Sequence, residues 1–80
     1  MSTEIRIKAE EAKRLKNDPA FKGVMASVRE TQISVFMNSE ADDVSAREEA
    51  HAMVRALNQI EVNLDAAIAA ETLLDRKQRK

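Results

Sequence analysis

The clearest hydrophobic pattern runs through the second half of the chain. Apolar positions recur there at alternating spacings of four and three residues, as in the seam of a heptad repeat. The seam consists of Ala46, Ala50, Met53, Leu57, Ile60, Leu64, Ala67, Glu71 and Leu74. Glu71 is its one polar member, and Val54 and Ile68 widen it on one side. This pattern predicts a long helix over residues 45–76.

A shorter helix is predicted at the N-terminus, over residues 3–16. Its apolar stripe is thin and consists of Ile5, Ala9, Ala12 and Leu15. A helix with so little apolar surface is marginal in water, so we expect it to dock on another element. The sequence Asn17–Asp18–Pro19 ends it, because proline disfavours helical backbone at the preceding residue.

A second helix is predicted over residues 19–37, with Asp18 as its cap and Pro19 at its first position. Its predicted buried side consists of Phe21, Val24, Met25, Val28, Val35 and Phe36, interrupted by Gln32. Gly23 inside this helix would be explained by a close contact with another helix. After a polar loop, Ser45 and Glu48 have the spacing of a capping box for the long helix.

These elements predict an all-α fold with one domain over residues 1–80, in which a short N-terminal helix precedes an antiparallel hairpin with a long C-terminal helix. The second helix is too short to cover the third beyond about Leu64. The remaining apolar stripe needs another surface, which either the first helix or a second protomer would supply. We therefore expect a homo-oligomer or larger assembly. The predicted interface consists of Leu57, Ile60, Leu64, Ala67, Ile68, Glu71 and Leu74.

Composition narrows the functional classes. The chain of 80 residues has no cysteine, one glycine, one proline and one histidine. Disulfides and thiolate metal sites are excluded, and a glycine-rich phosphate loop cannot form. No segment has the pattern of a signal peptide or a membrane span. We therefore expect a soluble, cytoplasmic protein that has no membrane partner.

Charge is distributed unevenly, although the formal net charge is only −1. Residues 1–29 carry seven basic and four acidic side chains, residues 30–75 carry two and ten, and residues 76–80 add four basic ones. This pattern suits contacts between copies better than general nucleic-acid binding, for which a basic face is typical. Lys13, Arg14 and Arg29 are candidate phosphate contacts, although basic residues near helix ends also complement the helix dipole.

One spacing has a precedent in metal chemistry. Glu48 and His51 lie three residues apart, as carboxylate and histidine ligands do in di-iron helical bundles. The helical geometry turns Glu48 away from the seam, and the predicted capping box already uses its carboxylate. We therefore expect no metal, no cofactor and no catalytic residue, and predict that the protein is not an enzyme.

Two segments resemble small proteins encoded by tailed bacteriophages. The resemblance lies in the strings Leu15–Lys16–Asn17–Asp18–Pro19–Ala20–Phe21 and Ala46–Arg47–Glu48–Glu49–Ala50–His51, followed by Val54–Arg55–Ala56–Leu57. It covers about residues 12–65 and implies an accessory or virion-associated protein without implying an activity.

The favoured functional hypothesis is a non-catalytic, oligomerising protein with a structural role in virion assembly, packaging or scaffolding. An alternative is a small phage inhibitor, or a helical hairpin that sequesters a host factor or a nucleotide signal. A minor alternative is a ferritin-like di-iron hairpin.

Overall fold

The computed structural model describes residues 2–78, which form three helices: α1 (Ser2–Asn17), α2 (Pro19–Asn38) and α3 (Val44–Gln78). No strand occurs within these residues. The all-α class, the short first helix and the long last helix are confirmed, and each predicted helix end lies within two residues of the observed one.

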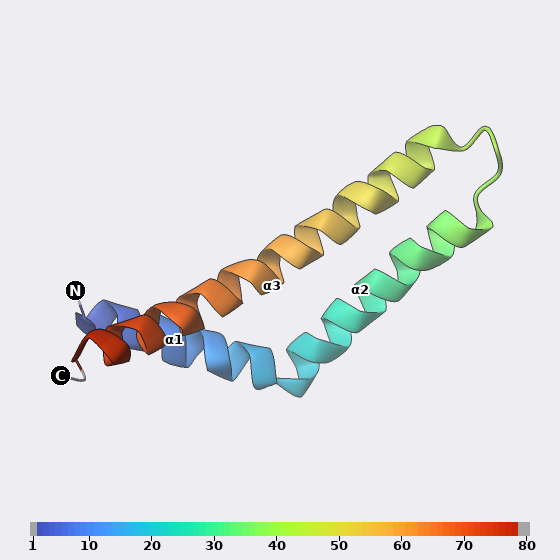
Figure 1. Ribbon diagram of the computed structural model, residues 1–80. Coiled ribbons are helices and arrows are strands. Elements are labelled where there is room, and N and C mark those ends of the chain that lie inside the picture. Colours follow the sequence, from blue (N-terminus) through green and yellow to red (C-terminus); the bar gives the residue numbers. More distant parts are fainter. Residues whose placement is uncertain (1, 79–80) are drawn as a thin grey trace.

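The first two helices lie end to end along α3 (Figure 1). α2 packs against the N-terminal part of α3, and α1 folds back over its C-terminal part. Both chain ends therefore lie at one end of the molecule, and the loop of residues 39–43 lies at the other. Of the two candidate covers for the end of α3, the first helix is the one that lies there.

The break between α1 and α2 forms as predicted. The Ala20 N–H donates to Asp18 Oδ1 at 2.8 Å, which caps α2, and Pro19 is its first residue. The Asp18 N–H donates to the Leu15 carbonyl at 3.1 Å, which closes the last turn of α1. The chain thus changes direction here with the N–H groups of Asp18 and Ala20 both hydrogen-bonded.

The predicted capping box at the start of α3 is wrong. α3 begins at Val44, so Ser45 lies inside the helix, and the Arg47 N–H donates to the Asp43 carbonyl at 3.1 Å. The loop is held instead by Asp43, whose Oδ2 accepts from the Glu40 N–H at 2.9 Å, and by Arg47, whose guanidinium donates to the Glu40 and Ala41 carbonyls. Asp43 rather than Ser45 holds the start of α3, because the Asp43 side chain reaches back to a backbone N–H of the loop.

The core is very small. Within the described residues only Ala9, Ala12, Ala50 and Leu57 are buried, and α2 buries no side chain fully. The predicted buried side of α2 is therefore partly wrong. Phe21, Met25 and Val28 are half-buried, but Val24, Val35 and Phe36 are exposed, while the interrupting Gln32 is half-buried. No helix contact explains Gly23, since a Cβ there would meet no atom within 4 Å.

The molecule is a rod of 59 × 22 × 17 Å with a radius of gyration of 17.3 Å. A compact domain of this length would have a radius of gyration of about 12 Å. Its accessible surface is 6272 Å², whereas about 4,800 Å² is typical of a folded monomer of its mass. The excess arises because two layers of helices, each one helix thick, cannot surround a core.

Candidate functional site

The two layers of helices meet along two long faces that differ in chemistry. One face, which we call the bridged face, is crossed by every ion pair that joins two helices within residues 2–78. The other, which we call the open face, is defined by Val24, Val28 and Val35 of α2 and by Met53 and Ile60 of α3. In the α2–α3 contact, helical spacing places these five on the opposite side from Arg29 and Glu61.

At the α1 end, the bridged face centres on Glu71. Lys13 Nζ lies 2.8 Å from Glu71 Oε1, and Arg6 lies 3.6 Å from the same carboxylate and 2.9 Å from Asp75. Lys16 pairs with Asp65 one turn further along. The Glu71 side chain is only 12% exposed. Its pairing with bases from α1 offsets the cost of placing a carboxylate on the seam.

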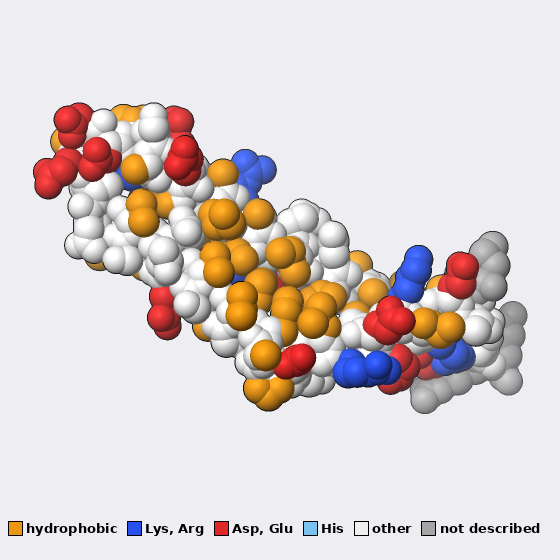
Figure 2. All heavy atoms as spheres, turned by 180° about the vertical axis from the view of Figure 1, so that it is seen from behind, with side chains coloured by type: hydrophobic (Ala, Val, Ile, Leu, Met, Phe, Trp, Pro, Cys, Tyr) orange, Lys and Arg blue, Asp and Glu red, His pale blue; other side chains and the backbone are white. Residues whose placement is uncertain are grey.

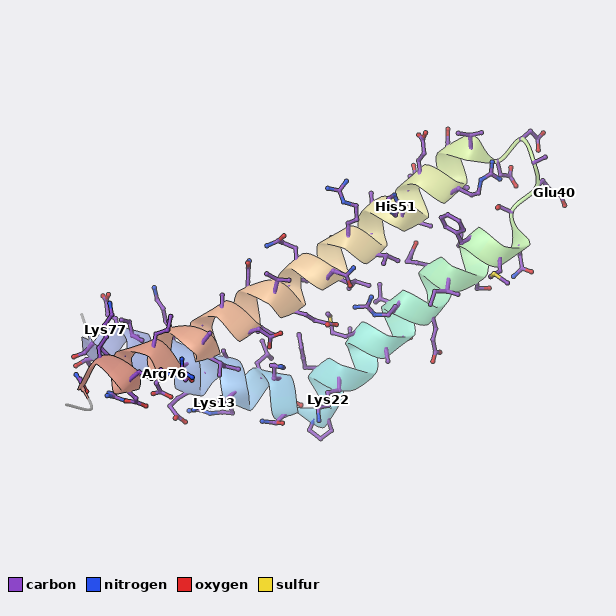
Figure 3. The ribbon with its side chains drawn as sticks, in the orientation of Figure 1. Lys13, Lys22, Glu40, His51, Arg76 and Lys77 are labelled. Atoms are coloured by element: carbon purple, nitrogen blue, oxygen red, sulfur yellow. The ribbon has the colours of Figure 1, made fainter. Side chains whose placement is uncertain are left out.

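The contact with Glu71 changes the pKa of Lys13. The hydrogen bond that Lys13 donates to Glu71, reinforced by the negative charge of that carboxylate, raises the pKa of Lys13 above its ordinary value. Lys13 is thus held as a cation by a carboxylate of the same chain. Figure 3 labels Lys13 on α1.

Near the middle of the rod, Arg29 crosses the same face. Its two terminal nitrogens donate to Asn58 Oδ1 at 3.0 Å and to Glu61 Oε1 at 2.8 Å. Beside this bridge lies a cavity with an apolar floor and a charged rim. It is lined by Lys16, Phe21, Lys22, Met25, Ala26, Arg29, Glu61, Leu64 and Asp65.

The three candidate phosphate contacts are not brought together. Lys13 and Arg29 both bind carboxylates of α3, 2.8 Å away in each case. Arg14 is exposed and lies beside Ile7 and Glu10 in a shallow hollow on the outer side of α1. A phosphate would have to compete with the two carboxylates for Lys13 and Arg29, which argues against the prediction that these residues bind a phosphate.

Toward the loop end, the bridged face contains an apolar pocket, which we call the loop-end pocket. It is lined by Gln32, Ile33, Phe36, Met37, His51 and Val54. Glu48 and His51 are both exposed, and no group of three metal-ligating side chains occurs within residues 2–78.

The open face is uncharged and mostly exposed. Four of its five defining side chains are exposed, from 37% for Val35 to 63% for Val24. Seen from behind, hydrophobic side chains form a patch across the middle of the molecule, and the charged side chains lie mainly toward its two ends (Figure 2).

The predicted interface residues separate into groups with different surroundings. Leu57 is buried inside the chain, Glu71 pairs with Lys13, and Ile60 remains 42% exposed. The other four are half-buried, namely Leu64, Ala67, Ile68 and Leu74. The seam divides because α3 meets two partners in succession, and a straight helix drifts by about 20° per heptad relative to a strict seven-residue repeat.

Comparisons with known proteins leave the function to be argued from these residues. No family model matches the chain, and neither the curated proteins nor the solved structures searched give a match. Among residues 2–78, no helix combines the length and hydropathy that crossing a bilayer requires.

Proposed function

We propose that the protein is a non-catalytic, self-associating protein with a structural role in the assembly of a larger particle, of the kind that the bacteriophage resemblance suggests. The observation that carries the proposal is the open face, an exposed apolar surface free of ion pairs on a rod in which four side chains among residues 2–78 are buried. Contiguous exposed apolar surface of this kind is typical of interfaces between proteins.

The energetics of a small chain support self-association. Folding must offset roughly 1–2 kcal/mol of backbone entropy per residue, mainly by removing apolar surface from water. Three of the four buried side chains are alanines, which contribute little apolar area. Small scaffolds with such cores usually gain stability from a disulfide, a metal or a partner chain. Without cysteines, and with no metal-ligating trio in residues 2–78, a partner chain is the favoured source.

Light scattering on the purified protein tests this function. At tens of micromolar we expect a mass of at least twice the 9.0 kDa of one chain, and thermal stability that rises with protein concentration, because association stabilises the folded form by mass action. A stable monomer with a concentration-independent melting temperature would overturn the proposal.

A second candidate function is the binding of a small anionic ligand, as in an inhibitor that sequesters a nucleotide. The observation that favours it is the cavity in which Lys16, Lys22 and Arg29 lie beside Phe21, since cations and an aromatic ring are the usual partners of a nucleotide. The carboxylates of Glu61 and Asp65 on the same rim oppose it.

A nucleotide panel separates the two functions. A ligand-binding protein should gain melting temperature with one nucleotide and lose that gain in Lys22→Ala, whereas an assembly protein should show no shift with any nucleotide. A shift retained in Lys22→Ala would place binding outside this cavity and would count against the second function as stated.

A further inference from the structure

α3 carries a second seven-residue repeat, which shares four positions with the seam that faces α1 and α2 and extends it toward the open side. We call it the open strip, and it consists of Glu49, Met53, Ala56, Ile60, Asn63, Ala67, Ala70, Leu74 and Lys77. Its members are separated alternately by four and three residues, so they lie along one side of the helix. The first five are exposed, and Ala67, Ala70 and Leu74 are half-buried beside α1.

The order of side chains along the open strip is close to symmetric. Its seven inner positions are uncharged, and its two ends carry opposite charges, Glu49 at the loop end and Lys77 at the other. Asn63 lies at the centre, fourteen positions from each end. Ala56 and Ala70 lie seven positions on either side of it, and such small side chains let two helices approach closely.

The charge of the whole rod has the same polarity. The acidic end comprises the loop and the first turns of α3, where residues 39–49 carry five acidic side chains and one basic. Residues 2–17 and 62–78 at the other end carry seven basic and six acidic, and residues 18–61 carry four and eight. Glu40 and Lys77 mark these two ends in Figure 3. Two rods side by side in the same direction would place like ends together, whereas opposite directions pair unlike ends.

We propose that two copies of the chain pair antiparallel through their open faces, about a two-fold axis that passes beside Asn63. Each Glu49 then lies opposite the partner's Lys77, the two Asn63 side chains meet, and Val24 and Val35 add apolar contacts at the flank. The inference rests on the proposed function, because it names the surface and geometry of the self-association suggested there.

A central asparagine suits this geometry. Asn63 Oδ1 accepts a hydrogen bond from Gln59 at 2.9 Å, and its own N–H groups donate none within the described residues. At a two-fold axis, each amide can donate to the other. A single asparagine in an apolar helix interface fixes the register, because any shift leaves it buried without a partner. The excess surface of the rod, about 1,400 Å², also exceeds the roughly 800 Å² per partner of a standard interface.

The loop-end pocket is the competing surface, and it is less suited to a second copy. It is short, it lies at one end of the rod, and the bridge from Arg29 to Asn58 and Glu61 separates it from the mid-rod cavity. A two-fold contact through it would bring two acidic ends together. The open strip is longer and ends in unlike charges, although α1 half-buries three of its positions, Ala67, Ala70 and Leu74.

Cysteine cross-linking tests the geometry, because the chain has no cysteine of its own. Under mild oxidation, Asn63→Cys should link more than about half of the chains, since a two-fold axis brings its two copies within the roughly 7 Å that a disulfide spans between Cα atoms. Val62→Cys is the matched control: its side chain is 57% exposed and turned about 100° away along the helix. It should link less than about a tenth of the chains.

Further variants fix the direction and the register. Met53→Cys should not link to its own copy, because an antiparallel pair holds the two positions some ten residues of helix on either side of the axis. Glu49→Lys or Lys77→Glu alone should weaken dimerisation by about three- to tenfold, and the double exchange should restore the dissociation constant to within about twofold.

The outcomes distinguish failure of the proposed interface from failure of the proposed function. If the wild-type protein is a multimer but Asn63→Cys links no better than Val62→Cys, the open strip is not the interface while the proposed function stands. Efficient Met53→Cys linking would replace the antiparallel pair by a parallel one. A monomeric wild type would overturn the proposed function, and the dimer with it.

Discussion

The bridged face and the open face run along the same helices but contribute to the structure in different ways. Five contacts between oppositely charged side chains cross the bridged face, and they join α1 and α2 to particular turns of α3. The open face has only valine, methionine and isoleucine at the corresponding positions. Exposed ion pairs contribute little free energy but specify which turns meet, whereas apolar surface stabilises only when it is covered.

This difference explains how so thin a molecule can hold its fold. The bridging pairs fix the register of α1 on α3, where Ala9 and Ala12 are buried. The driving force for keeping α2 on α3 is weaker, because α2 buries no side chain fully. A second copy over the open face would cover exposed Val24, Val35, Met53 and Ile60 and so supply the missing burial.

The largest expected effect comes from a charge on the open face. Ile60→Glu places one carboxylate from each chain in the proposed interface, where an unpaired charge is costly to bury. We expect the dissociation constant to rise at least about a hundredfold, which corresponds to roughly 2.7 kcal/mol. Sedimentation equilibrium measures it. Val62→Glu is the control, since Val62 is exposed on another side, and equal weakening in both variants would refute the distinction between the faces.

A smaller effect is expected from breaking the bridged face at its most buried member. Glu71→Ala removes the carboxylate that holds Lys13 and Arg6, and should lower the free energy of unfolding by about 1–2 kcal/mol in urea titrations. Asp75→Ala, at a side chain that is 50% exposed, should cost less than about 1 kcal/mol. The mass of the assembly should not change in either. Dissociation in Glu71→Ala at a concentration where it remains folded would place Glu71 in the interface.

The pH dependence of stability provides a second test of the contact between Lys13 and Glu71. Because the pKa of Lys13 is raised in the folded state, its contribution is fully present below the ordinary value of 10.5 and is lost as the pH rises through the raised value. Thermal unfolding between pH 9 and 12 should therefore show a loss of stability with rising pH, and this loss should be smaller in Glu71→Gln. An identical loss in the two proteins would mean that Lys13 is not the titrating group.

The smallest expected change in stability comes from a residue that belongs to neither face. Gly23 is exposed in the interior of α2, and a Cβ there meets nothing within 4 Å. Gly23→Ala should raise the stability by about 0.5–1 kcal/mol, because alanine loses less backbone entropy on entering a helix. The assembly should keep its mass, and destabilisation would reveal a close contact at Gly23.

Helix periodicity and the proline break were sufficient to predict the three helices and the cap at Asp18. The capping box at Ser45 failed because the Asp43 side chain reaches a loop amide that the local pattern does not single out. Sequence analysis also assigned Met53, Ile60 and Leu57 to one buried seam, although the first two are more than 40% exposed. Which side of a widely apolar helix faces its partner depends on where α1 and α2 lie, and spacing alone does not contain that information.

The open strip was present in the sequence but could be recognised only after the primary seam had been assigned. Glu49, Ala56, Asn63, Ala70 and Lys77 share a heptad position that looks like ordinary surface in the linear pattern. The arrangement of the helices makes them the flank beside Met53 and Ile60, which turns an unremarkable set of residues into a continuous surface.

The most direct test of the interface compares two isoleucines, one on each face. Ile33 in the loop-end pocket is 52% exposed and Ile60 on the open face is 42% exposed, so the two side chains are similarly accessible in a single chain. In a mixture of isotope-labelled and unlabelled protein, filtered nuclear Overhauser spectra detect only contacts between copies. We expect such contacts from the Ile60 methyl groups and none from Ile33. Contacts from Ile33 with none from Ile60 would contradict the assignment of the open face as the interface.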